Sequence, residues 1–288
     1  MESVKSYETQ HRSNVSFRIP SPVKASYKYG RYVDTNAARH KFLYSSKISK
    51  IPKTSTTNGI AGIKSGENND KQSEEISECQ NYLKFCQAHY GKNHFQTTDC
   101  MLQLGHAYMR AQYFKEALAT FKNAVRLRKL VHGNDHLSVG RALNCVGRAA
   151  ASMEEFDWGL LALYEALHIR FQQLGPWHID VADTLNNIAG IFYKMDKIEL
   201  AEEAYMEVIS VRKAVWGNNH PSVAVTSCSV GRIQLRRSNL TGACDSFKEA
   251  LRIYRVALNL KDSSPVVKKV LKNIARTERL MASMNASF

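Results

Sequence analysis

The sequence predicts an all-α protein, an α-solenoid of antiparallel helix pairs preceded by a disordered basic tail. A short motif with glycine first and histidine fourth recurs every 42 residues, at Gly91, Gly133, Gly175 and Gly217. Between these motifs, apolar residues recur at steps of three and four, which is the period of amphipathic helices. Residues 1–73 show neither pattern. A constant period without insertions indicates that each copy is one structural unit and that neighbouring units stack.

The predicted tail and linker comprise residues 1–73. This segment is rich in Ser, Thr, Asn, Lys and Arg and poor in aliphatic residues, so it cannot bury enough apolar surface to fold. Its 13 Lys or Arg residues against five Asp or Glu residues account for +8 of the net charge of +14. Within it, the stretch TSTTNGIAGIKSGENNDKQ (54–72) is predicted to be a flexible linker.

The predicted array spans residues 74–288 and begins with a lone helix over 74–90. Four full units follow, over 91–132, 133–174, 175–216 and 217–258. Each unit is expected to be two antiparallel helices joined by a short turn. The glycine just past each second helix predicts a backbone with positive φ, which glycine adopts at little cost. The histidine is expected to help start the next helix.

The two helices of a unit are expected to approach closely, because small residues recur on both. They lie at Gly105, Gly147, Ala189 and Gly231 on the first helices and at Ala117, Gly159, Ala201 and Ala243 on the second. A bulky residue follows four positions later on the second helix, at Phe121, Leu163, Tyr205 and Phe247. We expect these bulky side chains to pack over the small residues of the neighbouring helix.

The repeat decays after residue 258, where Asn259 and Asp262 replace the glycine and the histidine. The segment SPVVKKVLKNIARTERLMASM keeps apolar residues at helical spacing with basic residues between them. Residues 259–288 are therefore predicted to contain a capping helix, apolar toward the array and basic outside.

The first unit, LGHAYMRAQYFKEALATFKNA, resembles a tetratricopeptide repeat at Leu104, Gly105, Tyr108, Ala117, Phe121 and Ala124. The 42-residue period, the junction motif and VADTLNNIAGIFYKMDKIELAEEAY are similar to the repeats of kinesin light chains. The resemblance implies a right-handed superhelix that acts as a non-enzymatic adaptor or scaffold for protein partners. No heptad segment precedes the array, so the sequence does not favour a motor subunit that joins its heavy chain through a coiled coil.

Peptides are expected to bind on the concave surface lined by the first helices. The candidate residues are Arg141, Asn144, Arg148, Asn186, Asn187, Tyr193, Arg232 and Arg236, within a strip that also includes Asp99, His106, Met109 and Asp183. Asparagine can donate to and accept from a peptide backbone, and arginine can bind a carboxylate through two parallel hydrogen bonds. The arginines favour an acidic or C-terminal segment as the ligand. The alternative is a solvated helix face.

The tail offers short motifs in its basic sequence. SKIP, with Ser49, Ile51 and Pro52, resembles the signal that binds microtubule plus-end binding proteins, and the tail charge suits tubulin. Ser21, in SPVK, resembles a site for proline-directed phosphorylation. A microtubule- or cilium-associated factor is thus one alternative. Nucleic acid is another, because basic residues alternate with Tyr27, Tyr29, Tyr32, Phe42 and Tyr44, but no nucleic-acid-binding fold accompanies them.

The sequence shows no pattern for catalysis, metal or cofactor binding. There is no phosphate loop, HExxH motif or nucleophile elbow. The junction histidines stand one unit apart, about 10 Å per helix layer, too far to share a zinc ion with bonds of about 2 Å. The six cysteines form no CxxC pair and are expected to be small buried hydrophobic residues. No apolar run long enough to span a membrane and no secretion signal are present, so a cytoplasmic location is expected.

Overall fold

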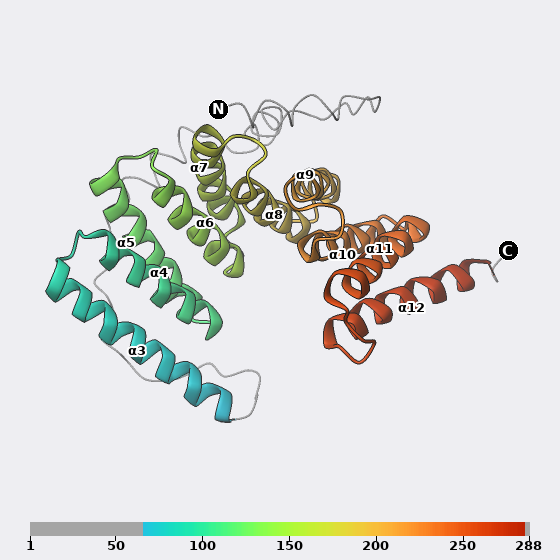
Figure 1. Cartoon of the computed structure of the whole chain (residues 1–288), viewed down its shortest axis with the longest axis horizontal. Helices are drawn as coiled ribbons and strands as arrows, with labels where there is room; N and C mark the ends of the chain where they lie inside the picture. Colours follow the sequence, from blue (N-terminus) through green and yellow to red (C-terminus); the bar gives the residue numbers. More distant parts are fainter. Residues whose placement is uncertain (1–65, 286–288) are drawn as a thin grey trace, which may run out of the picture.

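The computed structural model describes residues 66–285, and this part of the chain consists of ten α-helices without a β-strand (Figure 1). The first is α3 (Gly66–Tyr90) and the last is α12 (Pro265–Asn285). Between them lie four pairs: α4 (Phe95–Arg110) with α5 (Phe114–His132), α6 (Leu137–Ser152) with α7 (Phe156–Leu174), α8 (Ile179–Lys194) with α9 (Ile198–Trp216), and α10 (Pro221–Arg236) with α11 (Leu240–Leu258). The predicted all-α solenoid of helix pairs is confirmed.

The helix pairs follow one another along an arc, with α4, α6, α8 and α10 on its inner side and α5, α7, α9 and α11 on its outer side (Figure 1). Each helix packs mainly against its neighbours in sequence. In addition, α4 lies against α6 and α6 against α8, a closer approach than that between successive second helices. The array therefore curves toward its first helices. We call the exposed and half-buried residues of α4, α6, α8 and α10 the inner face.

The glycine and the histidine at each junction both have a structural role. Gly133, Gly175 and Gly217 end their helices with φ of 78–84° and ψ of 168–172°, a region that is essentially restricted to glycine. The histidine is the N-cap residue of the next helix. At His178, Nδ1 accepts a hydrogen bond from the backbone N–H of Asp180 at 3.1 Å. His94, His136 and His220 make the same bond two residues on, so the expected helix-starting role is confirmed.

The turn inside each pair depends on a left-handed residue that the sequence pattern did not reveal. Gln112, Glu154, Asp196 and Ser238 stand 42 residues apart and have φ of 59–63°. Glutamine, glutamate and serine have no particular preference for this conformation. The packing of the two helices, rather than the residue type, therefore determines the backbone at this turn.

The predicted small and bulky positions do pack against each other. A Cβ atom on Gly105 would lie 2.3 Å from Cε1 of Phe121, and one on Gly147 would lie 2.4 Å from Cγ of Leu163. Both distances are shorter than a van der Waals contact, so glycine is required where the bulky side chain crosses the first helix. Gly231 meets the ring of Phe247 in the same way.

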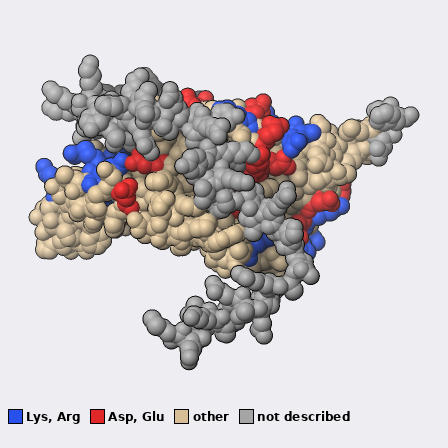
Figure 2. Space-filling model, turned by 90° about the horizontal axis from the view of Figure 1, so that it is seen from above, with Lys and Arg blue, Asp and Glu red and all other residues tan. Residues whose placement is uncertain are grey.

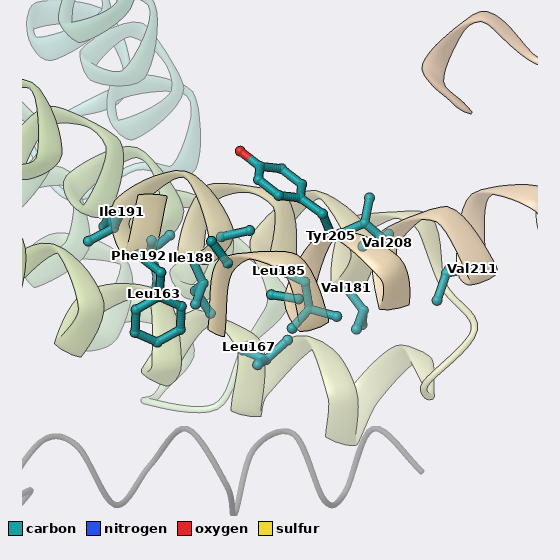
Figure 3. Close-up of a cluster of buried hydrophobic side chains, with 14 of the residues drawn as sticks. Leu163, Leu167, Val181, Leu185, Ile188, Ile191, Phe192, Tyr205, Val208 and Val211 are labelled. Carbon is teal, nitrogen blue, oxygen red and sulfur yellow. The ribbon is translucent and has the colours of Figure 1, made fainter. Parts of the chain in front are cut away.

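The largest buried cluster joins α7, α8 and α9, as Figure 3 shows, and also includes Val230 and Ile233 of α10. It includes Leu163 and Leu167 from α7, Val181, Leu185, Ile188, Ile191 and Phe192 from α8, and Tyr205, Val208 and Val211 from α9. A second cluster joins α4 to α7, and a third joins α10 to α12. Because each cluster draws on adjoining pairs, a pair alone would leave apolar side chains exposed.

The leading helix begins earlier than the sequence predicted. It starts at Gly66 rather than at residue 74, so the helix extends over residues 66–73, which the sequence assigned to the end of the tail and linker. Polar residues can extend a helix because each one adds a backbone hydrogen bond, although they leave no apolar signal. At the other end, Asn259 replaces the junction glycine in a left-handed conformation with φ of 46°, and α12 packs on α11.

Candidate peptide-binding face

The predicted peptide-binding residues all lie on the inner face. Arg141, Asn144 and Arg148 belong to α6, Asn186, Asn187 and Tyr193 to α8, and Arg232 and Arg236 to α10. The four arginines are exposed, and the other four residues are half-buried. Spacings of three, four and seven residues keep side chains on one side of a helix, which is why the sequence could select this set.

Two of the predicted asparagines bind each other across α6 and α8. Nδ2 of Asn187 donates to Oδ1 of Asn144 at 2.9 Å. An amide group has two donor hydrogens and an acceptor oxygen, so each side chain keeps hydrogen-bonding capacity beyond this bond. Asn186 is half-buried beside Asn187 on α8. We call Asn144, Asn186 and Asn187 the amide layer; α8, which carries two of them, comes between α6 and α10 among the first helices of the array.

Arg236 differs from the other predicted arginines because it has an ion-pair partner among the described residues. Its guanidinium lies 5.5 Å from the ring centroid of Tyr193 and pairs with Oδ1 of Asp196 at 3.0 Å. Stacking on an aromatic ring and pairing with a carboxylate both hold a guanidinium in place. Arg236 and Tyr193 therefore form a fixed edge of the inner face, and the positive charge at this edge is partly neutralised.

Arg141, Arg148 and Arg232 have no ion pair with any residue in the range 66–285. Arg232 donates to the hydroxyl of Ser229 at 3.0 Å, which leaves its charge uncompensated. Neither α6 nor α10 contains an Asp or Glu residue. The two acidic members of the predicted strip, Asp99 and Asp183, are instead bound by arginines of the second helices. The inner face therefore presents positive charge without matching acids on α6 and α10.

Three buried arginines form a set that the sequence analysis missed. Arg128, Arg170 and Arg212 lie on α5, α7 and α9 and are 2%, 6% and 7% exposed. Arg128 and Arg212 pair with Asp99 and Asp183. Each of the three also donates to a backbone carbonyl ten residues later, in the next pair. Their spacing of 42 residues was the available signal, but arginine is usually a surface residue and was not assigned to the core.

His106 adds a titratable group to the inner face, at the same place in the repeat as Arg148 and Arg232. Its Nε2 lies 3.6 Å from Sγ of Cys145, and its ring meets the edge of Phe121. Burial lowers the pKa of His106, and the charges of Arg148 and Arg110 lower it further. A neutral imidazole at this place leaves the arginines as the main charges of the face.

The cysteines are free thiols in this structure. Cys86, Cys100, Cys145 and Cys244 are buried, and Cys79 and Cys228 are half-buried. Burial raises the pKa of Cys228 to about 11, which disfavours the reactive thiolate. Within the described range, no group of three or more His, Cys, Asp or Glu residues is placed to hold a metal ion. None of the ten helices is both long and apolar enough to cross a membrane.

The tail residues that the sequence selected lie outside the described part of the chain. They are Ser21, Ser49, Ile51 and Pro52.

The opposite side of the molecule has a different charge pattern. Figure 2 views the side where α7 and α9 lie in Figure 1, and Lys and Arg there lie beside Asp and Glu in mixed groups. On the second helices, the mostly buried side chains of Lys129 and Glu165 also pair, at 2.5 Å. Paired charges of opposite sign neutralise each other locally and contribute little to recognition of one sign of charge.

Comparison with known proteins agrees with this architecture. Two tetratricopeptide repeat models match the sequence, over residues 97–138 and 161–255. The structure is similar to BtubC (BKLC) from P. vanneervenii, with a TM-score of 0.58 and 17% identity over 76% of this chain and 91% of that one. It is also similar to nearly identical TPR-like repeats assigned to a kinesin light chain of Podosopora anserina, with a TM-score of 0.58 and 15% identity over 67% and 90%. No curated protein matches the sequence.

Residues 97–138 and 161–255 thus match tetratricopeptide repeats, and the fold is similar to that of kinesin-light-chain-like repeats. The resemblance inferred from the junction motif and the 42-residue period is confirmed. Arrays of this family are protein–protein interaction scaffolds. The curvature of the solenoid creates an extended concave surface on which a partner can bind. The fold is therefore that of a binding module.

Proposed function

We propose that the chain is a non-enzymatic adaptor or scaffold that binds an acidic segment, or a chain-terminal carboxylate, of a partner protein on its inner face. The observation that carries the proposal is the set Arg141, Arg148 and Arg232. These arginines are exposed on first helices that contain no acid, and they have no ion pair within residues 66–285. Arginine binds carboxylates through charge-assisted hydrogen bonds, which are about twice as strong as neutral ones.

The amide layer supports the same proposal. Asn186 and Asn187 lie on α8, which comes between α6 and α10 among the first helices, and Asn144 lies on α6. Their remaining donors and acceptors suit the backbone of an extended peptide. A peptide along the inner face would meet positive charge on either side of amide groups. Acidic side chains at the ends of such a segment would then be favoured over basic ones.

The proposal is tested by fluorescence anisotropy with the full chain and labelled decapeptides. A blocked peptide of alternating Glu and Ala is compared with its Gln and Lys counterparts, and a Gln–Ala peptide is compared with a free and an amidated C terminus. We expect the Glu peptide to bind most tightly of the three and its affinity to fall with added salt, because exposed charges are screened within about 8–10 Å. Equal affinities for the Glu, Gln and Lys peptides would show that the inner face is a solvated helix surface.

A natural partner can be sought by affinity purification with the wild type beside the double variant Asn186→Ala/Asn187→Ala. A protein that is retained by the wild type and lost by the variant would identify both the ligand and its binding surface. Retention of the same proteins by both would place the binding site elsewhere on the chain.

A second binding function is proposed for the tail, on the basis of its sequence. The SKIP motif at residues 49–52 and the excess of basic residues suit a microtubule plus-end binding protein or the acidic surface of tubulin. Co-sedimentation of the tail peptide with microtubules, and separately with RNA, over a salt series distinguishes the two alternatives. Pelleting with microtubules alone supports the cytoskeletal role, and pelleting with RNA alone supports the nucleic-acid role.

A further inference from the structure

One position of the inner face holds an aspartate in two of the helix pairs but an arginine in the pair between them. The residue 29 positions before each buried arginine lies on the first helix of the same pair. That residue is Asp99 before Arg128 and Asp183 before Arg212, but Arg141 before Arg170. The α6–α7 pair thus replaces an acid with a base at a place where both adjoining pairs form an ion pair.

In the two adjoining pairs, the carboxylate binds the buried arginine from the solvent side. Nη2 of Arg212 donates to Oδ1 of Asp183 at 2.7 Å, and Nη2 of Arg128 donates to Oδ1 of Asp99. The arginine side chains are 9% and 3% exposed, whereas the aspartate side chains are 49% and 41% exposed. A carboxylate at this position therefore stays accessible from the inner face while it neutralises a guanidinium below it.

Arg170 has the same surroundings without the carboxylate. Its Nη1 donates to the backbone oxygen of Asp180 at 2.8 Å and to Oγ1 of Thr184 at 2.7 Å. Nη1 of Arg212 makes the equivalent two bonds to Ser222 and Thr226. Arg170 has no ion pair within residues 66–285, and it is 6% exposed. A buried charge without a counterion is unfavourable, so this site is prepared for an anion that the pair itself does not provide.

Charges of both signs act on Arg170. Burial is the largest influence and lowers the pKa of Arg170; Asp180 and Asp183 raise that pKa, and the charge of Arg141 lowers it to a smaller extent. Asp183 is already engaged by Arg212, and the backbone of Asp180, rather than its carboxylate, is the group that Arg170 binds.

On the basis of the proposed function, we infer that Arg170 and Arg141 form the subsite for one carboxylate of the bound segment. The carboxylate, from an acidic side chain or a chain terminus, takes the place that Asp99 and Asp183 occupy in the adjoining pairs. Nη2 of Arg170 donates to this carboxylate from the buried side. The exposed Arg141, which stands at the repeat position of Asp99 and Asp183, donates to the same carboxylate. The ligand thereby completes a row of three carboxylates along α4, α6 and α8.

The substitution Arg141→Asp places a carboxylate of the chain itself beside Arg170. It therefore distinguishes binding at this subsite from a general attraction of acidic peptides to positive charge. We expect two results. The unfolding temperature rises by about 2–4 °C above the wild type, because Arg170 gains its counterion. Affinity for the blocked Glu–Ala decapeptide falls at least about tenfold, because the place is already occupied. Arg141→Gln leaves Arg170 free, so it should not raise the unfolding temperature and should weaken binding only about threefold.

Arg126→Asp is the matched control. Arg126 is exposed on α5, a second helix, and the substitution changes the net charge by the same amount. We expect no rise in unfolding temperature and at most about a threefold loss of affinity, the effect of distant charge in salt. Two peptides distinguish the source of the carboxylate: the blocked Glu–Ala peptide has only side-chain carboxylates, and a Gln–Ala peptide with a free end has only the terminal one. The peptide that loses tenfold in Arg141→Asp identifies the source.

Failure of this inference can be told apart from failure of the proposed function. If a peptide binds the wild type but Arg141→Asp weakens it no more than Arg126→Asp does, the subsite is wrong and the binding face stands. An unfolding temperature of Arg141→Asp no higher than that of Arg141→Gln would also overturn the subsite. If neither peptide binds the wild type more tightly than the Lys peptide, the binding face itself is wrong.

Discussion

The α6–α7 pair and the two pairs beside it share their packing but differ in charge. In all three, a small residue of the first helix faces a bulky one of the second, a histidine caps the first helix, and an arginine of the second helix is buried against the next pair. The α4–α5 and α8–α9 pairs neutralise that arginine with their own aspartate, whereas the α6–α7 pair has Arg141 there. The residues that recur in every pair stabilise the solenoid. Arg141, which breaks the pattern, is the residue from which we infer the ligand subsite.

The largest effect is expected from the packing that all pairs share. Gly147→Val should lower the free energy of unfolding by about 3 kcal/mol, because even a Cβ atom at this position would lie 2.4 Å from Cγ of Leu163. Gly190→Ala on α8 is the control, since the nearest atom to its added Cβ is Oη of Tyr205 at 3.7 Å. Urea denaturation of the two variants measures the difference. Equal stabilities would mean that the helices do not approach as closely as described.

The next effect concerns the charge that distinguishes the pairs. Asp183→Asn should lower the free energy of unfolding by about 1–2 kcal/mol, because Arg212 loses a charge-assisted hydrogen bond. Half of the Asp183 side chain is exposed, which keeps the effect at this size. Asp245→Asn, on the exposed side of α11, should change little and serves as the control in thermal melts. A similar loss in both variants would mean that the buried arginines do not need their aspartates.

The junction histidines should have equal effects in pairs that differ in charge. His136→Ala and His178→Ala each remove an N-cap hydrogen bond and should lower the free energy of unfolding by about 1 kcal/mol. Replacement by asparagine should restore most of that loss, because asparagine is a good N-cap residue. Chemical denaturation of the four variants measures the result. A loss that asparagine does not restore would assign the histidine a role other than capping.

The smallest effect is a pH dependence at His106. Its pKa is lower in the folded chain than the ordinary 6.5, mainly because of burial, so the unfolded chain binds a proton more readily. As the pH falls below 6.5, the unfolded state is favoured and stability is lost. His106→Gln should therefore lose less stability than the wild type between pH 7.5 and pH 5.5, in urea melts. An unchanged pH dependence would mean that His106 titrates alike in both states.

The helices and their packing could be predicted because the physical signals repeat. The glycine at each junction adopts a backbone conformation that other residues avoid, and Gly147 stands where Leu163 leaves no room for a Cβ atom. The left-handed turn residues could not be predicted, since Gln112 and Glu154 share a conformation but no chemical preference for it. The start of α3 at Gly66 was missed because its first residues are polar.

The candidate site could be predicted only as a set of positions. Helical spacing was sufficient to place Arg141, Arg148 and Arg232 on one face, but not to show which charges have partners. Asp183 was assigned to the binding strip although Arg212 already holds it. A contact between two helices depends on side-chain reach across the pair, which spacing along one helix does not report.

The central claim, that unpaired arginines of the inner face bind carboxylates, is tested most directly by calorimetric titration with the blocked Glu–Ala decapeptide. Two triple variants remove the same charge: Arg141→Gln/Arg148→Gln/Arg232→Gln from the inner face, and Lys115→Gln/Arg126→Gln/Lys213→Gln from the second helices. We expect the first to weaken binding at least about 100-fold and the second less than about threefold. Equal losses in the two variants would contradict the claim, because the peptide would then respond only to the net charge of the chain.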